Sequence, residues 1–362
     1  MGGRLRQSVP LAPLTTLGIG GPARLFFEAT SEEDVARATA HADQAKLELL
    51  VLGGGSNLLV ADRGFDGLAL QVSIAGVTSE PLDGDRVLVT AGAGESWDGL
   101  VEWAVARDLE GLECLSGIPG RVGATPIQNV GAYGQEVSRT IVSVRAWDRI
   151  ANRAVELGRD DCGFAYRTSC FKIDASRRHV IVAVTFEVRS GGEPCVRYPE
   201  LVRALAERGA TRPGLKTVRE TVLALRRSKS MVIDPADPDS RSAGSFFLNP
   251  ILDSDSAACA TQSGRSAGIL GPDEAPPCFD AGHGKVKLPA AWLIERSGLS
   301  KGQALGRAGI SRNHPLSLVN RGGATAGEML DLARLVRARV REVFGVTLEV
   351  EPTLVGFEPG AF

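Results

Sequence analysis

The chain has few cysteines and histidines among its 362 residues, and it has no long apolar run. The six cysteines form no CxxC pair, and with the four histidines they show no metal-binding spacing, so the sequence predicts no metal site. No segment approaches the roughly 18 consecutive apolar residues that a membrane-spanning helix needs. Residues 1–13 lack the apolar core of a signal peptide. We therefore expect a cytoplasmic protein, not bound to a membrane, whose thiols are free and mostly buried.

Excess positive charge is also missing, because the formal net charge is −2. A dedicated nucleic-acid binder needs clustered excess lysine and arginine, so this class is disfavoured. The Walker A and HExxH motifs are absent as well. With 43% hydrophobic and 23% charged residues, the chain has the composition of a globular protein. Its length predicts about two or three domains.

Glycine is abundant, and two clusters resemble phosphate-binding loops. Residues 18–23 loosely fit a dinucleotide fingerprint, but no strand precedes them and Pro22 interrupts them, so we reject that interpretation. Residues 53–57 (GGGSN) follow a predicted strand at 47–52 and offer backbone N–H groups to an anion. A tight turn between strands explains this short motif equally well.

The apolar pattern predicts a mixture of helices and strands. The predicted helices are one beginning at Ser31, one from Ser96 through Leu109, and those at 199–208, 217–229, 289–297 and 325–344. A capping box of Thr217 and Glu220 is expected to begin the fourth of them. Further strands are predicted at 67–74, 86–91, 140–148, 179–188 and 346–357. Residues 111–134 have no periodic pattern and are expected to form a long functional loop.

Six segments, in order along the whole chain, resemble the UDP-N-acetylenolpyruvoylglucosamine reductase family of vanillyl-alcohol-oxidase-like flavoproteins. They are LGGGSNL at 52–58, IPGRVGATPIQNVGAYGQ at 118–135, GFAYR at 163–167, AGSFFLNP at 243–250, VKLPAAWLIE at 286–295 and LEVEP at 348–352. The resemblance implies an α+β protein with a two-lobed FAD-binding fold and a C-terminal α/β substrate-binding domain. The implied boundaries are 1–75 with 346–362 for the first lobe, 76–232 for the second and 233–345 for the substrate domain. The isolated final strand would then return to the first lobe.

The resemblance also implies non-covalent FAD, with NADPH as co-substrate. No histidine or cysteine lies within either glycine-rich loop, which suits a flavin held without a covalent bond. The implied cofactor-binding residues are Gly53, Gly54, Gly55, Ser56, Asn57, Pro119, Gly120, Gly123, Thr125, Gln128, Asn129, Gly131 and Ala132.

Three residues match the family's catalytic positions. Arg167 would stabilise the negative charge that forms next to the carbon receiving hydride, although an arginine in another context is usually a surface ion pair. Ser245 would donate the second proton, and otherwise it is a small turn residue. Glu351 would act beside Arg167, either by donating a proton to the substrate carboxylate or through a relay, and without the motif it is a solvated strand residue.

The resemblance implies the substrate UDP-N-acetylglucosamine enolpyruvate, which is reduced to UDP-N-acetylmuramate for peptidoglycan. The implied substrate-binding residues are Tyr198, Arg226, Lys229, Asn249, Lys301 and His314. We expect a monomer. Two alternatives stay open at this point: another flavin oxidase or dehydrogenase of the same fold, and a protein that binds FAD or a UDP-sugar without catalysis.

Overall fold

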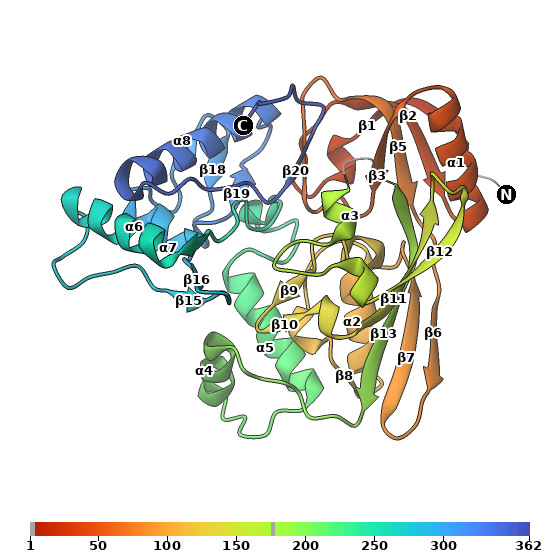
Figure 1. Ribbon diagram of the computed structural model, residues 1–362, viewed down its shortest axis with the longest axis horizontal. Coiled ribbons are helices and arrows are strands. Elements are labelled where there is room, and N and C mark those ends of the chain that lie inside the picture. Colours follow the sequence, from red (N-terminus) through yellow and green to blue (C-terminus); the bar gives the residue numbers. More distant parts are fainter. Residues whose placement is uncertain (1–3, 175–177) are drawn as a thin grey trace. The chain divides into compact units, whose positions relative to one another are not determined.

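A computed structural model describes residues 4–174 and 178–362 (Figure 1). The chain divides into two compact units, each with its own hydrophobic core. Unit 1 contains the described part of Met1–Val9 together with Ala23–Gly55 and Phe65–Ser228. Unit 2 contains Pro10–Pro22, Ser56–Gly64 and Lys229–Phe362. The division into three domains stays a prediction.

The first sheet of unit 1 has the strand order β1-β2-β5-β3. These strands are β1 (Arg6–Pro10), β2 (Pro22–Ala29), β5 (Phe65–Val72) and β3 (Glu48–Leu52). Both β2 and β3 run parallel to β5. Helix α1 (Glu32–Gln44) connects β2 to β3, and its N-cap Ser31 accepts a hydrogen bond from Asp34 N, as predicted from the sequence. Strand β3 ends directly at the GGGSN loop.

The second sheet of unit 1 has the order β12-β11-β13-β7-β6, and β8 also pairs with β13. Its strands are β12 (Arg153–Gly158), β11 (Ile141–Asp148), β13 (His179–Ser190), β7 (Arg86–Gly92), β6 (Val77–Pro81) and β8 (Leu109–Glu110). All these pairs are antiparallel. Trp97, the first residue of helix α2 (Trp97–Val105), is fully buried against Phe186 with ring centroids 5.9 Å apart. This aromatic pair therefore fixes the start of α2 against the sheet.

The remaining elements of unit 1 are short or helical. They are β9 (Gly131–Ala132), β10 (Gln135–Glu136), α3 (Cys170–Ile173), α4 (Pro199–Glu207) and α5 (Leu215–Ser228). Between 111 and 134 the backbone is irregular except for β9 and the 3-10 turns Glu113–Leu115 and Val122–Ala124. The long ordered loop predicted from the sequence is thus confirmed.

Two predicted helix limits are wrong. Helix α2 ends at Val105, because Asp108 takes a left-handed conformation with φ of 55° and Leu109 already pairs with β13. Helix α5 begins at Leu215 and not at a capping box, because Gly214 O accepts the hydrogen bond from Val218 N. Thr217 therefore lies within the first turn, where the sequence pattern alone suggested a cap.

Unit 2 is built around a long amphipathic helix, α8 (Ala326–Phe344). Thr325 and Glu328 form a complete capping box at its start, and Gly345 ends it in a left-handed conformation. The other helices are α6 (Ser254–Ser266) and α7 (Ala290–Arg296). Two three-stranded antiparallel sheets have the orders β14-β16-β15 and β17-β18-β19, with strands β14 (Ile251–Asp253), β16 (Lys285–Lys287), β15 (Phe279–Asp280), β17 (Ala304–Leu305), β18 (Ala308–Ile310) and β19 (Leu318–Asn320).

The C-terminal strand returns to an N-terminal segment. Strand β20 (Thr353–Val355) pairs in parallel with β4 (Leu58–Val60), which directly follows the GGGSN loop. The strand is shorter than the predicted range of 346–357, and Val350 forms a separate bridge with Phe247. The pairing of the solitary end strand therefore depends on a partner far away in the sequence.

All six cysteines are unpaired. Cys114 and Cys162 are buried, but Cys259 and Cys278 are exposed, so the expectation of mostly buried thiols is wrong for this pair. In the described part of the chain, no cluster of three metal-ligating side chains occurs. None of the described helices is both long enough and apolar enough to cross a membrane.

Candidate active site

The glycine loop after β3 packs backbone against backbone on the 118–135 loop. A Cβ atom added to Gly54 would lie 2.7 Å from Gly120 Cα, so no other residue fits there without displacing the main chain. Gly55 has a φ of +61°, a conformation that favours glycine. The two loops therefore expose closely spaced backbone at one place in unit 1. Such a surface fits a cofactor that carries phosphate groups.

The 118–135 loop is held in turn by the connection between β7 and α2. Trp97 N donates to Gly120 O at 3.1 Å, and Gly123 N donates to Ala93 O at 2.9 Å. A Cβ on Gly123 would lie 2.5 Å from Ala93 Cβ, so glycine is required here as well. The other predicted cofactor residues of this loop are Pro119, Gln128 and Ala132, which are half-buried, and Thr125, which is buried.

Arg167, the predicted catalytic arginine, is tied to this same loop. Its guanidinium donates from Nη1 to Asn129 O at 3.2 Å and from Nη2 to Gly131 O at 2.6 Å. Asn129 is buried, and its side-chain amide donates to Ala165 O at 3.1 Å. Ala165 and Thr168 exchange two backbone hydrogen bonds, which makes a tight turn with Arg167 at φ of 53°. The structure thus brings Arg167, Asn129 and Gly131 together within unit 1.

Two tyrosines and an arginine lie further along unit 1. The predicted substrate residue Tyr198 is 43% exposed and meets Tyr133 edge to face, with ring centroids 5.5 Å apart. Burial raises the pKa of Tyr133 to about 12. Arg226, on α5, is buried, and this burial lowers its pKa. Sequence analysis gave Tyr133 no role, although its place in the segment GAYG at 131–134 was a signal.

In unit 2 the backbone brings Asn57, Ser245 and Glu351 together. Glu351 N donates to the carbonyl oxygen of Phe246, the residue after Ser245, at 3.0 Å. The Asn57 side-chain amide donates to Glu351 O at 3.3 Å, and Thr353 N donates back to Asn57 O at 3.0 Å. Ser245 and Glu351 are both half-buried, as is Ser56. Two predicted catalytic residues and one predicted cofactor residue therefore share one small backbone network.

The remaining predicted substrate residues of unit 2 lie on separate elements. Asn249 Oδ1 accepts a hydrogen bond from Ala290 N at the start of α7, at 2.9 Å. His314 Nδ1 accepts one from Leu316 N at 3.1 Å, which is a local turn contact. Lys301 is exposed, with Nζ 3.9 Å from Glu295 Oε1, and Lys229 is half-buried. These contacts orient Asn249 and His314, and the substrate roles of all four stay predictions.

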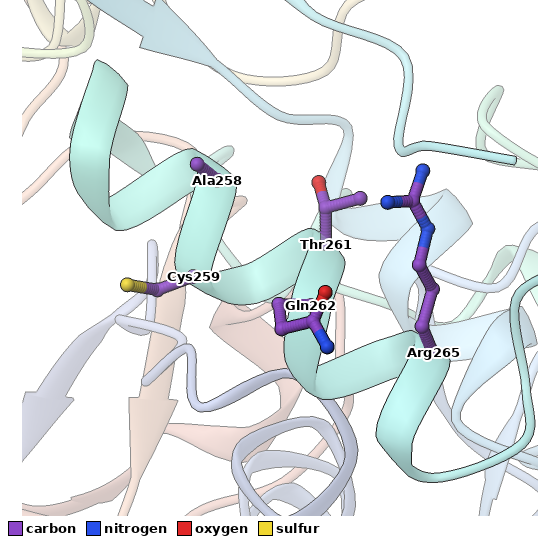
Figure 2. A pocket seen from close by; sticks show the side chains of 5 residues that line it. All are labelled: Ala258, Cys259, Thr261, Gln262 and Arg265. Carbon is purple, nitrogen blue, oxygen red and sulfur yellow. The ribbon is translucent and has the colours of Figure 1, made fainter. Parts of the chain in front are cut away.

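A surface pocket of about 550 Å³ lies along α6 (Figure 2). Its lining side chains are Ala258, Cys259, Thr261, Gln262 and Arg265. None of them belongs to the predicted site, so this pocket adds nothing to the candidate active site.

Comparison with known proteins decides the family. One family model, an FAD binding domain, matches residues 23–152, and another, the C-terminal domain of UDP-N-acetylenolpyruvoylglucosamine reductase, matches residues 235–355. UDP-N-acetylenolpyruvoylglucosamine reductase of Thermobifida fusca is 52% identical over 351 residues, which are 97% of this chain and 98% of the relative. The chain belongs to the UDP-N-acetylenolpyruvoylglucosamine reductase family. The reductase of Mycobacterium tuberculosis is 43% identical to it over 370 residues, covering 98% of this chain and 96% of the relative.

Family membership confirms the predicted fold class and enzyme class. The crystal structure of the reductase from Thermus caldophilus covers 98% of this chain and 99% of its own, with a TM-score of 0.64 and 26% identity. The reductase described here is an α+β flavoprotein of the vanillyl-alcohol-oxidase type with a C-terminal family domain. It is an oxidoreductase, and its cofactor is FAD.

Proposed function

We propose that this reductase converts UDP-N-acetylglucosamine enolpyruvate to UDP-N-acetylmuramate for peptidoglycan precursor synthesis, with NADPH as the reductant. The observation that carries the proposal is the match to reductases of this name over nearly the whole chain. FAD, when bound, supplies hydride exchange between NADPH and the enolpyruvyl group. The absence of histidine and cysteine from both glycine-rich loops supports non-covalent binding.

Arg167 is proposed to stabilise negative charge on the substrate. Hydride addition to the terminal enolpyruvyl carbon leaves negative charge on the neighbouring carbon and its carboxylate. A guanidinium is permanently charged and offers several N–H donors in a fixed plane. Because two backbone carbonyls already hold Arg167, little reorganisation is needed when that charge develops. This preorganisation supports a catalytic role.

Ser245 is proposed to give the second proton to the carbon next to the carboxylate. A serine hydroxyl is a weak acid, but a carbanion is a strong enough base to take its proton if the geometry is right. Glu351 is proposed to act beside the same carboxylate, either by donating a proton or through a relay. Glu351 N donates a hydrogen bond to the carbonyl oxygen of Phe246, the residue that follows Ser245. This bond keeps the backbones at Ser245 and Glu351 close together, which supports a joint role of the two residues.

The other residues are proposed to hold the ligands. Four of them would contact phosphate, sugar or carboxylate groups of the substrate: Arg226, Lys229, Asn249 and Lys301. Tyr198 would close over the substrate, and His314 would lie on its uridine side. We further propose three structural domains with the boundaries expected from the sequence, a monomeric state, and a cytoplasmic location where NADPH and UDP-sugars are available.

The decisive experiment combines a spectrum with turnover. Purified protein is expected to show the visible absorption of a flavin and to oxidise NADPH in proportion to added UDP-N-acetylglucosamine enolpyruvate. A yellow protein that oxidises NADPH but leaves this substrate unchanged would favour a different flavin oxidase or dehydrogenase. A protein that binds the ligands with no turnover would favour the binding-protein alternative.

A further inference from the structure

One carboxylate, Asp98 in the first turn of α2, joins two parts of unit 1 that carry predicted ligand residues. Its Oδ1 accepts a hydrogen bond from Gly117 N at 2.6 Å, immediately before the predicted cofactor loop. The Arg219 guanidinium binds both of its oxygens, at 2.6 Å and 3.0 Å. Arg219 lies on α5, the helix that also carries Arg226. Asp98 therefore connects the start of one loop with the side of one helix.

The contact between Asp98 and Arg219 is well shielded from solvent on the arginine side. The Arg219 side chain is only 10% exposed, and that of Asp98 is 36% exposed. Two parallel bonds between a guanidinium and a carboxylate fix the relative orientation of the groups as well as their distance. A third bond, from Gly117, uses the same carboxylate, so the loop and the helix cannot shift independently without breaking a charge-assisted bond.

Arg219 and Arg226 lie on the same side of α5. They are seven residues apart, which is about two helical turns, and both are buried. The negative charge of Asp98 also favours the charged form of Arg226, opposing the burial that lowers the pKa of Arg226. A group that holds Arg219 therefore also helps to fix the position of Arg226 on the same helix.

We propose that Asp98 is a positioning residue that couples the cofactor loop to the helix carrying Arg226. It acts through Gly117 on the loop and through Arg219 on the helix. The inference rests on the proposed function, because the ligand roles of the loop and of Arg226 belong to that proposal. Side chains that support a binding residue in this way commonly decide how accurately the residue is placed.

The test compares Asp98→Ala with a matched variant, Asp148→Ala. Asp148 is also a carboxylate in unit 1 that binds an arginine, Arg178, and accepts backbone hydrogen bonds, from Ile150 and Ala151 at 3.0 Å. Both variants should lower the melting temperature. Only Asp98→Ala is expected to raise the Kd for FAD, measured by flavin release on dilution of the holoenzyme, and the KM for the sugar nucleotide, each by about tenfold or more.

Variants of Arg219 separate the two connections. Arg219→Met leaves the bond between Gly117 and Asp98 possible, so it should raise the KM for the sugar nucleotide about tenfold while the Kd for FAD changes less than about threefold. Arg219→Lys retains the charge, so its KM for the sugar nucleotide should lie between the wild-type value and that of Arg219→Met. Should Asp98→Ala fail to fold, Asp98→Asn keeps one acceptor for Gly117, and it should reproduce the Arg219→Met pattern.

Two outcomes would overturn the inference. In the first, the Asp98 variants lose stability as Asp148→Ala does, but keep the wild-type Kd for FAD and KM. In the second, Arg219→Met changes neither constant. A wild-type protein that neither binds FAD nor turns over the substrate would overturn the proposed function and this inference with it. Normal wild-type turnover with unchanged Asp98 variants would overturn this inference alone.

Discussion

The side-chain amide of Asn57 donates a hydrogen bond of 3.3 Å to the backbone carbonyl oxygen of Glu351, a residue 294 positions later in the chain. Thr353 N completes the connection by donating to Asn57 O at 3.0 Å. The end of the glycine loop and the LEVEP segment are therefore one structural unit. A substitution at Asn57 is therefore expected to change the backbone position of Glu351.

Asn57→Ala tests this connection. Removing the side-chain amide should lower the free energy of unfolding by about 1 kcal/mol, because the Glu351 carbonyl loses a hydrogen bond in a half-buried place. Denaturation in urea, followed by circular dichroism, measures the effect. Gln262→Ala on α6 (Figure 2) is the control, since that exposed side chain should contribute less than about 0.5 kcal/mol. Equal effects in the two variants would contradict the connection.

Gly54→Ala tests the close approach of the two glycine-rich loops. The added methyl group would collide with Gly120 Cα at 2.7 Å, and both loops would have to move. We expect a loss of about 1–3 kcal/mol in unfolding free energy together with weaker retention of FAD during gel filtration. Gly271→Ala is a suitable control, because nothing lies within 4 Å of its Cβ position. Normal FAD retention in Gly54→Ala would show that the loops are not a cofactor surface.

The sequence predicted elements where a periodic pattern and a start signal coincide. Ser31 with its acidic first turn and Thr325 with Glu328 mark α1 and α8 clearly. By contrast, α6 consists mainly of small and polar residues and has no apolar stripe, so its pattern did not stand out. Strand β12 follows a turn and is only partly buried along its length, which removes the usual alternation.

The spatial arrangement of the candidate site was harder to predict from the sequence than the helices and strands were. The motif match pointed to Arg167, Ser245 and Glu351 separately, but no local pattern reports that Glu351 N binds Phe246 O. Asp98 was missed for the same reason, and Tyr133 was missed although it lies within the GAYG segment at 131–134. Their contacts with Tyr198 and Arg219 join segments 65 and 121 positions apart, and such contacts arise only when the chain has folded.

The pH dependence of the free energy of unfolding should show how much the ionised side chain of Asp148 stabilises the fold. Hydrogen bonds from Arg178 hold the pKa of Asp148 well below its ordinary value, against the effect of burial and with help from Ala151 N and Ile150 N. Since the pKa is lower in the folded state, the stabilisation is present above the unfolded pKa of about 4 and is lost as the pH falls through the folded pKa. At pH 7 the free energy of unfolding of the wild type should exceed that of Asp148→Asn by about 1.5–3 kcal/mol. This difference in unfolding free energy should become smaller only below about pH 4. If this difference already became smaller between about pH 7 and 5, a titratable group other than Asp148 would be responsible for it.

Arg167→Lys separates charge from geometry. A lysine retains the positive charge but cannot donate to Asn129 O and Gly131 O in one plane while facing the substrate. We expect kcat for sugar-nucleotide reduction to fall by about 100-fold or more, with flavin reduction by NADPH changed much less. Rapid-mixing absorbance of the flavin measures the two half-reactions separately. Wild-type kcat in this variant would show that charge alone suffices.

Ser245→Ala tests the proposed proton donor most directly. Ser245 lies beside Phe246, whose carbonyl holds Glu351 N, so the variant removes one hydroxyl while the main-chain network can persist. Reduction of the flavin by NADPH should stay near the wild-type rate, and its reoxidation by the sugar nucleotide should slow by about 100-fold or more. Ser254→Ala, at the exposed start of α6, is expected to leave both half-reactions unchanged. Because a serine that only fills a turn would affect folding but not one half-reaction alone, equal loss in both half-reactions would reject Ser245 as the proton donor.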